Sequence, residues 1–388
     1  MKPIPYSRQD ISTEDISAVV EALQSEFITQ GPTVELFEDA LARFVSARHA
    51  VAVNSATSAL HIACLSLGVG EGDLVWTSPL SFVASANCAL FCKASVDFVD
   101  VDPVSGNMCP ECLERKLRNA EVSGRLPKVL IVVHFSGMPC PMERISQLAR
   151  LYGVKVVEDA SHALGASDNG VPVGGSNLSE IVIFSLHAVK VITTGEGGMA
   201  TTNDDDLAAK MRSLRSHGIT RDPTRMVEPT GEPWYYEQRD LGYNYRMTDI
   251  QAALGLSQLS RLRSMMERRE RIAAKYLALE AKAPVFTPCV RERCSPAWHL
   301  YVVRLRLDLI SRSKEQIFNE MLKRGVRLNV HYIPIHTHPF YRSMGFKVGS
   351  FPNSERFYSQ AVSLPMYPSL TFAEQDYVIE SFSEVLTQ

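Results

Sequence analysis

The sequence contains, between a strand pattern and a turn pattern, the run Phe184-Ser185-Leu186-His187-Ala188-Val189-Lys190-Val191-Ile192-Thr193-Thr194-Gly195-Glu196-Gly197-Gly198. Residues 180–186 are mostly apolar and predict a buried strand, whereas the threonines and glycines that follow predict a turn. Lys190 stands between them. Burying an ammonium is costly, and desolvation lowers the pKa of the amine and makes it a nucleophile toward carbonyl groups. The alternative is a lysine whose stem crosses an apolar rim while its head reaches water.

Two segments upstream carry groups that complement a buried lysine. Residues 155–162 predict a short strand that ends on Glu158 and Asp159. Because ligands of open α/β sheets bind at the carboxyl ends of the strands, Asp159 is expected at a ligand site. Residues 51–60 predict a strand, a small polar turn and a helix, an arrangement that offers free N–H groups to a phosphate. A lysine, a carboxylate and an anion site are what pyridoxal phosphate (PLP) requires.

In these segments the chain resembles the fold-type I, PLP-dependent nucleotide-sugar aminotransferases. The resemblance covers nearly the whole length and is carried by Thr29-Gln30-Gly31-Pro32, Asn54-Ser55-Ala56-Thr57-Ser58-Ala59-Leu60, Glu158-Asp159-Ala160, Ser185 to Lys190, Thr194-Gly195-Glu196-Gly197-Gly198 and Gly242-Tyr243-Asn244-Tyr245-Arg246-Met247. It implies an α/β fold with a mostly parallel central sheet in a large domain, followed by a smaller α+β domain.

The resemblance also implies roles for single residues. Lys190 and Asp159 match the catalytic pair, the lysine that holds PLP and carries protons and the carboxylate that pairs with the pyridine nitrogen. The positions that match other cofactor contacts are Ala56, Thr57 and Ser185 for the phosphate, Phe82 for the ring face, His162 beside the cofactor and Asn244 for the phosphate of the neighbouring subunit. Asn244 therefore implies a homodimer with shared active sites. The alternatives from the residues alone are a helix N-cap for the phosphate positions, a core aromatic for Phe82, a hydrogen-bonded core histidine for His162 and a polar turn around Asn244.

Three segments expected to face the substrate resemble the branch of the family that acts in the pseudaminic acid pathway. They are the segments 232–238, 329–334 and 364–368. This branch implies glutamate as donor, a UDP-linked 4-keto-6-deoxy-N-acetylhexosamine as acceptor and UDP-4-amino-4,6-dideoxy-N-acetyl-altrosamine as product; a different nucleotide-linked ketosugar remains open. Arg246, Tyr332 and His336 are candidate substrate contacts. A metal cluster of His331, His336 and His338 is disfavoured, because no carboxylate or thiolate accompanies them and Pro334 breaks their spacing.

Two functions of other classes also remain open. One is a PLP- or pyridoxamine-phosphate-dependent sugar dehydratase of the same fold, which works without the attachment lysine; Lys190 argues against it. The other is a non-catalytic scaffold that binds a nucleotide-sugar, because a fold by itself does not establish activity.

Length and periodicity predict two domains. The 388 residues exceed what one hydrophobic core usually supports. Strand and helix patterns alternate up to about residue 217, which favours a parallel sheet covered on both faces. We expect a large PLP-binding domain over residues 1–247, and over residues 248–388 a long bridging helix, 248–281, and a small domain. The charged run 268–271 in that helix is expected to face solvent.

Composition and the N-terminal sequence bear on the possible binding partners and on the cellular location of the protein. A formal net charge of −3 gives no electrostatic footprint for nucleic acid or an anionic membrane. The N-terminus lacks an apolar signal core, so a cytoplasmic location is expected. Eight cysteines in a chain of this length do not predict a disulfide framework. Cys109 and Cys112 could bind zinc or act in redox chemistry, but a helix opened by Pro110 explains their spacing more simply.

Overall fold

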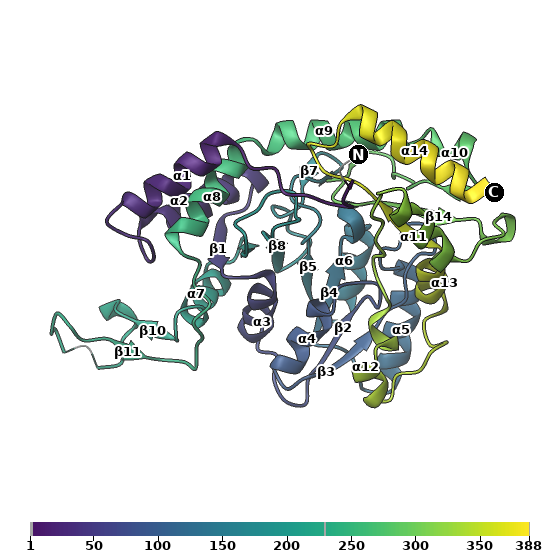
Figure 1. Cartoon of the computed structure of the whole chain (residues 1–388). Helices are drawn as coiled ribbons and strands as arrows, with labels where there is room; N and C mark the ends of the chain where they lie inside the picture. Colours follow the sequence, from purple (N-terminus) through teal and green to yellow (C-terminus); the bar gives the residue numbers. More distant parts are fainter. Residues whose placement is uncertain (1–2, 229, 388) are drawn as a thin grey trace.

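A seven-stranded sheet forms the centre of the molecule in the computed structural model, which describes residues 3–228 and 230–387 (Figure 1). The strand order is β1-β9-β8-β5-β4-β2-β3. The bounds are β1 (His49–Val53), β2 (Leu74–Thr77), β3 (Ser95–Phe98), β4 (Val129–Val133), β5 (Lys155–Asp159), β8 (Ile181–Ser185) and β9 (Gly198–Thr202). Strand β9 is antiparallel to both of its neighbours, β1 and β8, and the other neighbouring pairs are parallel. The predicted mostly parallel sheet is therefore confirmed.

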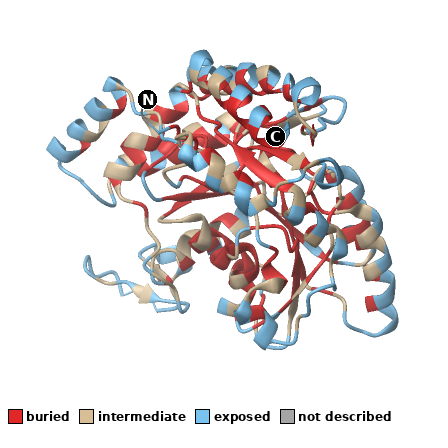
Figure 2. Cartoon of the chain, turned by 45° about the vertical axis from the view of Figure 1, so that its right-hand side comes forward, coloured by how far each residue is buried: buried red, intermediate tan, exposed pale blue. Residues whose placement is uncertain are grey.

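Helices cover both faces of this sheet. The helices of the large region are α1 (Thr13–Gln24), α2 (Pro32–Val45), α3 (Ala56–Ser66), α4 (Ala84–Phe91), α5 (Pro110–Val122), α6 (Met142–Leu151) and α7 (Asp205–Leu214). Side chains of α3, α4 and α7 form one apolar cluster with one face of the sheet. On the opposite face, α2 packs against one part of the sheet, and α5 and α6 pack against another part. The buried residues consequently gather in the middle layer, with exposed residues on the outer helices (Figure 2).

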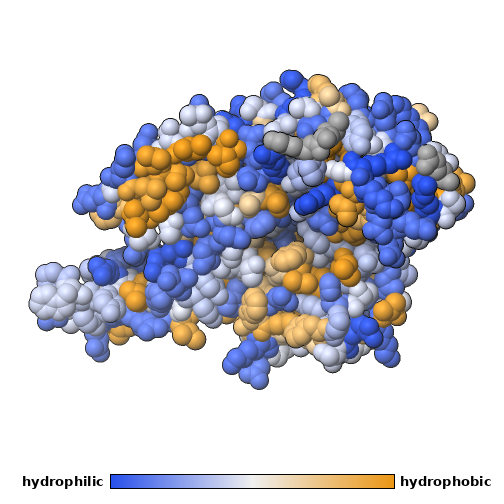
Figure 3. All heavy atoms as spheres, in the orientation of Figure 1, coloured by the Kyte–Doolittle hydropathy of each residue, from blue (hydrophilic) through white to orange (hydrophobic). Residues whose placement is uncertain are grey.

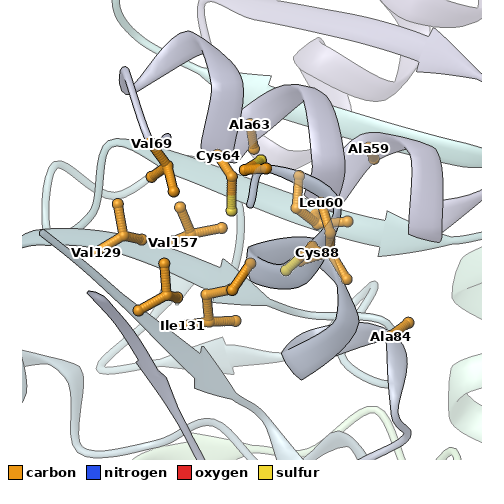
Figure 4. Packing of buried hydrophobic residues seen from close by; sticks show 14 of the residues in the cluster. Ala59, Leu60, Ala63, Cys64, Val69, Ala84, Cys88, Val129, Ile131 and Val157 are labelled. Carbon is orange, nitrogen blue, oxygen red and sulfur yellow. The ribbon is translucent and has the colours of Figure 1, made fainter. Parts of the chain in front are cut away.

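The core under α3 shows how strand alternation builds the two layers. Val129 and Ile131 of β4 and Val157 of β5 point toward Ala63 and Cys64 of α3 (Figure 4). Every second residue of a strand faces the same side, so the residue between the first two, Leu130, belongs to the cluster on the opposite face. Cys64, Cys88 and Cys92 are all buried and pack as small residues of this core.

The C-terminal region contains a second, smaller sheet with its own helices. Its antiparallel sheet joins β12 (Val285–Phe286), β14 (Tyr301–Leu305) and β15 (Ala361–Leu364). Its further helices are α11 (Lys314–Lys323), α12 (Pro339–Ser343), α13 (Pro352–Gln360) and α14 (Phe372–Thr387). Ile4 pairs with Val326 of this region, and the backbone N–H of Met366 donates to the carbonyl of Tyr6. The first residues of the chain thus lie on its last third, while the predicted boundary at residue 247 stays a prediction.

The long helix expected over residues 248–281 is divided. The structure has α8 (Asp249–Ser260), α9 (Leu262–Tyr276) and α10 (Leu279–Lys282). Arg261, between α8 and α9, turns its guanidinium to Asp15 at the start of α1, with an N–O distance of 2.6 Å. The expectation that residues 268–271 face solvent is wrong for Arg269. That side chain is 1% exposed and donates to the carbonyls of Trp298, His299 and Met366.

Short elements complete the chain. They are β6 (Ser167–Asp168), β7 (Val171–Pro172), β10 (Ile219–Thr220), β11 (Glu237–Gln238), β13 (Cys294–Ser295) and the 3-10 helices Phe135–Gly137, Pro223–Arg225, Leu307–Leu309 and Ile335–Thr337. The β10–β11 hairpin extends away from the body of the molecule (Figure 1). Among the described residues, no helix has both the length and the apolar character needed to cross a membrane.

Helix α5 explains the cysteine pair that the sequence left open. Pro110 is its first residue, and Cys109 is its N-cap, accepting a hydrogen bond from the backbone N–H of Cys112 at 3.4 Å. Burial and the neighbouring Cys112 thiol raise the pKa of Cys109 to about 12, so this thiol is not activated at neutral pH. The expected helix opened by Pro110 is confirmed.

Candidate active site

A cavity of about 470 Å³ lies where strands β5 and β8 end. Eight of the predicted site residues line it: Ala56, Thr57, Phe82, Asp159, His162, Ser185, Lys190 and Tyr332. They come from segments up to about 280 positions apart, which the parallel strands and the C-terminal region bring together. The position agrees with the rule that ligands of α/β sheets bind at the carboxyl ends of the strands.

Lys190 lies in the loop that follows β8. The backbone N–H of Thr194 donates to the carbonyl of Leu186, and that of Leu186 donates to the carbonyl of Gly197, so the loop folds back on the end of the strand. Lys190 keeps some exposure to the cavity, but the surrounding protein desolvates its amine and lowers its pKa to about 8. The carboxylate of Asp159 opposes this shift. A lysine in this state carries a substantial fraction of neutral, nucleophilic amine near neutral pH.

Asp159 is the last residue of β5 and is 6% exposed. Its Oδ1 accepts a hydrogen bond from the backbone N–H of Ser161 at 3.1 Å, and its Oδ2 accepts one from the hydroxyl of Ser85 at 2.6 Å. These two hydrogen bonds hold both carboxylate oxygens of Asp159 in place at the edge of the cavity.

The start of α3 provides an anion site. Ser55 is the N-cap: its hydroxyl accepts from the N–H of Ser58, and its carbonyl accepts from the N–H of Ala59. Of the first-turn N–H groups, which have no partner within a helix, those of Ala56 and Thr57 remain for a ligand. N-capping and anion binding are therefore compatible here, because different residues provide them.

Gly198 allows β9 to pass directly beside this helix start. A Cβ atom at this position would lie 2.5 Å from the backbone nitrogen of Ala56 and 2.5 Å from the carbonyl oxygen of Ser55. Any larger residue would push the first turn of α3 away from the sheet. The second glycine of the Gly197-Gly198 pair therefore preserves the geometry of the anion site.

Neutral imidazoles and a tyrosine form another wall of the cavity. The hydroxyl of Tyr332 lies 3.0 Å from His162 Nε2, and the rings of His162 and His299 are 4.5 Å apart. Burial and the nearby Lys190 lower the pKa of His331 to about 3 and that of His162 well below its ordinary value. No described residue is a hydrogen-bond partner of His162 Nδ1. This buried nitrogen is thus available to a bound molecule.

Three predicted residues lie outside this cavity. Asn244 is exposed, and Arg246 donates to the hydroxyl of Ser216 at 3.1 Å. His336 is fully buried and its Nε2 lies 2.8 Å from Glu355 Oε1. The structure thus corrects the expectation that His336 faces the substrate: a carboxylate of α13 and surrounding aromatic rings hold it inside the protein.

Sequence reasoning missed Tyr6 and His299, which also line the cavity. Tyr6 comes from the N-terminal segment, and its ring lies 5.7 Å from that of His331. His299 directly precedes Leu300 and β14. Neither has a local motif around it. Only the docking of the N-terminal segment and of the C-terminal region reveals them.

The residues present fit PLP. A largely desolvated lysine amine, an anionic carboxylate, free helix N–H groups and an unpartnered buried imidazole nitrogen surround one cavity. Phe82, 59% exposed, adds an aromatic ring to the lining of the same cavity. These groups match the aldehyde, the ring nitrogen, the phosphate and the ring face of the cofactor.

Comparison with known proteins agrees with this site. Residues 9–383 match the family described as the DegT/DnrJ/EryC1/StrS aminotransferase family. The chain is 39% identical over 393 residues to the spore coat polysaccharide biosynthesis protein SpsC of Bacillus subtilis, covering 99% of this chain and 97% of SpsC. It is 36% identical to a UDP-4-amino-4,6-dideoxy-N-acetyl-beta-L-altrosamine transaminase of Campylobacter jejuni, with coverage of 99% and 97%.

Solved structures give the same result. Helicobacter pylori PseC, an aminotransferase involved in the biosynthesis of pseudoaminic acid, superimposes with a TM-score of 0.90 at 31% identity, covering 99% of each chain. The Streptococcus pneumoniae protein Spr1654 in its PMP form superimposes with a TM-score of 0.89 at 30% identity, covering 98% of each chain.

Proposed function

Since the chain belongs to the DegT/DnrJ/EryC1/StrS aminotransferase family and is a PLP-dependent sugar aminotransferase, we propose that it moves an amino group from glutamate to C4 of a UDP-linked 4-keto-6-deoxy-N-acetylhexosamine. The product is UDP-4-amino-4,6-dideoxy-N-acetyl-altrosamine. The single observation that carries the catalytic part is that the desolvated amine of Lys190 and the carboxylate of Asp159 line one cavity. The similarity to the Campylobacter transaminase and to PseC supports the choice of sugar.

In this proposal the side chains and backbone of the protein hold the cofactor in place and transfer protons. PLP, when bound, supplies an electron sink for the carbon that loses or gains the amino group. Asp159 would hold the pyridine nitrogen, and the N–H groups of Ala56 and Thr57 with the hydroxyl of Ser185 would hold the phosphate. Lys190 Nζ takes a proton from the amino-bearing carbon of the donor and later delivers one to C4 of the sugar. The neutral wall of His162, His331 and Tyr332 adds no charge that would compete for that proton.

The proposed enzyme is a homodimer with shared active sites. Asn244 does not line the cavity of its own chain, so a role at the phosphate requires a second copy. Helix α1 supports a partner, because it exposes an apolar stripe of Ile16, Val20 and Leu23 at 57%, 43% and 55%. This stripe belongs to a wide apolar area over α1 and α2 (Figure 3). We place the reaction in the cytoplasm, where a reducing environment keeps thiols free.

The test of the proposed reaction follows the bound cofactor through both half-reactions. We expect the purified protein with PLP to show a visible absorbance band that glutamate removes and the UDP-4-keto-6-deoxy-N-acetylhexosamine restores, with the amino sugar appearing by mass spectrometry. Aspartate and UDP-N-acetylglucosamine, which lacks the ketone, are the controls. A band that glutamate bleaches but this ketosugar fails to restore would contradict the proposed acceptor, and a band unaffected by any amino donor would contradict the transaminase reaction.

The pKa of Lys190 gives a second expectation. A neutral amine reacts with acetic anhydride and an ammonium does not, so labelling of Lys190 in PLP-free protein should be half-maximal near pH 8. The group is protonated and unreactive below this pH, and neutral and reactive above it. Peptide mass spectrometry over a pH series measures the labelling, with exposed Lys347 as the internal reference. A midpoint near the ordinary value of 10.5 would contradict the desolvated site.

A further inference from the structure

We infer that Ser85 is a positioning residue of the reaction, which fixes the carboxylate of Asp159 through a buried chain of hydroxyl groups that begins at Ser81. The inference rests on the proposed function, since it concerns the residue proposed to hold the pyridine nitrogen. Ser85 itself does not line the cavity. It would act only through Asp159.

The hydroxyl chain is short and buried, and Ser81 at its outer end also lines the cavity. The distance from Ser81 Oγ to Ser85 Oγ is 2.7 Å, and that from Ser85 Oγ to Asp159 Oδ2 is 2.6 Å. Ser81 is 3% exposed and Ser85 is fully buried. Hydrogen bonds to an ionised group are stronger than neutral ones, and a buried donor cannot be replaced by water.

The direction in which each hydrogen bond of this chain is donated is fixed. An ionised carboxylate only accepts hydrogen bonds, so the single hydroxyl proton of Ser85 goes to Asp159. Ser85 then has none left for Ser81, and Ser81 must donate to Ser85. The order is therefore Ser81 to Ser85 to Asp159. A donated bond polarises the hydroxyl that receives it, so Ser81 strengthens the bond that Ser85 makes.

Each of the two hydrogen-bond donors to Asp159 holds a different oxygen of its carboxylate. The backbone N–H of Ser161 lies on the same strand end and holds Oδ1 at 3.1 Å. The hydroxyl of Ser85 comes from α4 and holds Oδ2. Together they fix both oxygens and prevent the carboxylate from turning about its last bond. A lone pair is thereby kept facing the cavity for the ring nitrogen.

The segment that carries these serines also carries the ring expected to cover the cofactor. Phe82 follows Ser81 directly, and its carbonyl accepts the backbone N–H of Ser85 at 3.3 Å. The turn from residue 81 to residue 85 thus places the aromatic ring of Phe82 in the lining of the cavity and the hydroxyl of Ser85 on the carboxylate of Asp159. The sequence Ser81-Phe82-Val83-Ala84-Ser85 therefore connects two contacts of the cofactor in one rigid unit.

The test compares Ser85→Ala, Ser81→Ala and a matched control, Ser66→Ala. Ser66 is also a buried helical serine, but its hydroxyl donates only to the carbonyl of Ala63 within α3. We expect Ser85→Ala to lower kcat by roughly tenfold, with KM for both substrates nearly unchanged, because one bond to a charged group is lost. Ser81→Ala should show a smaller loss, and Ser66→Ala none.

A spectroscopic readout separates positioning from a loss of structure. The visible absorption of bound PLP should change in Ser85→Ala in the direction shown by Asp159→Asn, but less, while the PLP dissociation constant rises. Thermal unfolding of each variant shows whether it folds; if Ser85→Ala does not, the same changes must appear in Ser81→Ala. Values of kcat and spectra equal to those of Ser66→Ala would overturn the inference. A wild type that neither binds PLP nor transfers an amino group would instead overturn the proposed function.

Discussion

Lys190→Ala is expected to lower the rate of amino transfer by at least about a thousandfold, because it removes both the attachment point of PLP and the group that carries the proton. The desolvated amine of Lys190 lies in the same cavity as Asp159, and no other lysine of the described chain lines that cavity. No neighbouring amine can therefore take over. Steady-state turnover and the covalent retention of PLP after borohydride reduction measure the effect.

The control for this variant is Lys347→Ala, which removes an exposed lysine that does not line the cavity. It should retain the activity and the borohydride-fixed cofactor of the wild type, and the modified peptide should contain Lys190. Turnover of Lys190→Ala within tenfold of the wild type would sink the assignment of Lys190. The scaffold interpretation of the sequence would gain support only if the wild type itself released no amino sugar.

Mixing two impaired variants is expected to restore activity if active sites are shared between subunits. Asn244→Ala should lower activity by roughly ten- to a hundredfold, the usual effect of losing a hydrogen bond to a charged group. In a mixed dimer of Lys190→Ala and Asn244→Ala, one site carries both changes and the other carries none. Equal amounts, unfolded and refolded together or co-expressed, should therefore give about a quarter of the wild-type activity, since half of the dimers are mixed.

The matched control is the mixture of Lys190→Ala with Asp159→Asn. Both residues line the cavity of the same chain, so every site of a mixed dimer keeps one defect and activity should stay low. Rescue in the first mixture but not in the second identifies Asn244 as a residue given to the partner. Equal, low activity in both mixtures would mean that Asn244 serves its own chain or none. A monomeric mass by light scattering would contradict the dimer directly.

Much of the large region could be predicted because its signals are local. Apolar runs of four to six residues separated by helical patterns specify strands such as β4 and β8, and a proline such as Pro110 marks the start of a helix such as α5. The antiparallel β9 within a mostly parallel sheet was not predicted, since strand direction depends on where the chain returns to the sheet. The break in the long helix also escaped, because Asp15, more than two hundred residues away, pairs with the residue at the break.

The sequence by itself determined that a lysine, a carboxylate and a helix start lie at strand ends, because each sits in a short segment whose own periodicity places it there. The tertiary structure alone decided which side chains complete the site. Tyr6, His299 and Ser81 line the cavity, and Ser85 contacts Asp159 from behind. His336 is instead held in the core by a hydrogen bond to Glu355. The physical reason is that burial and hydrogen-bond partners come from packing between distant segments, and no local pattern records which segments will meet.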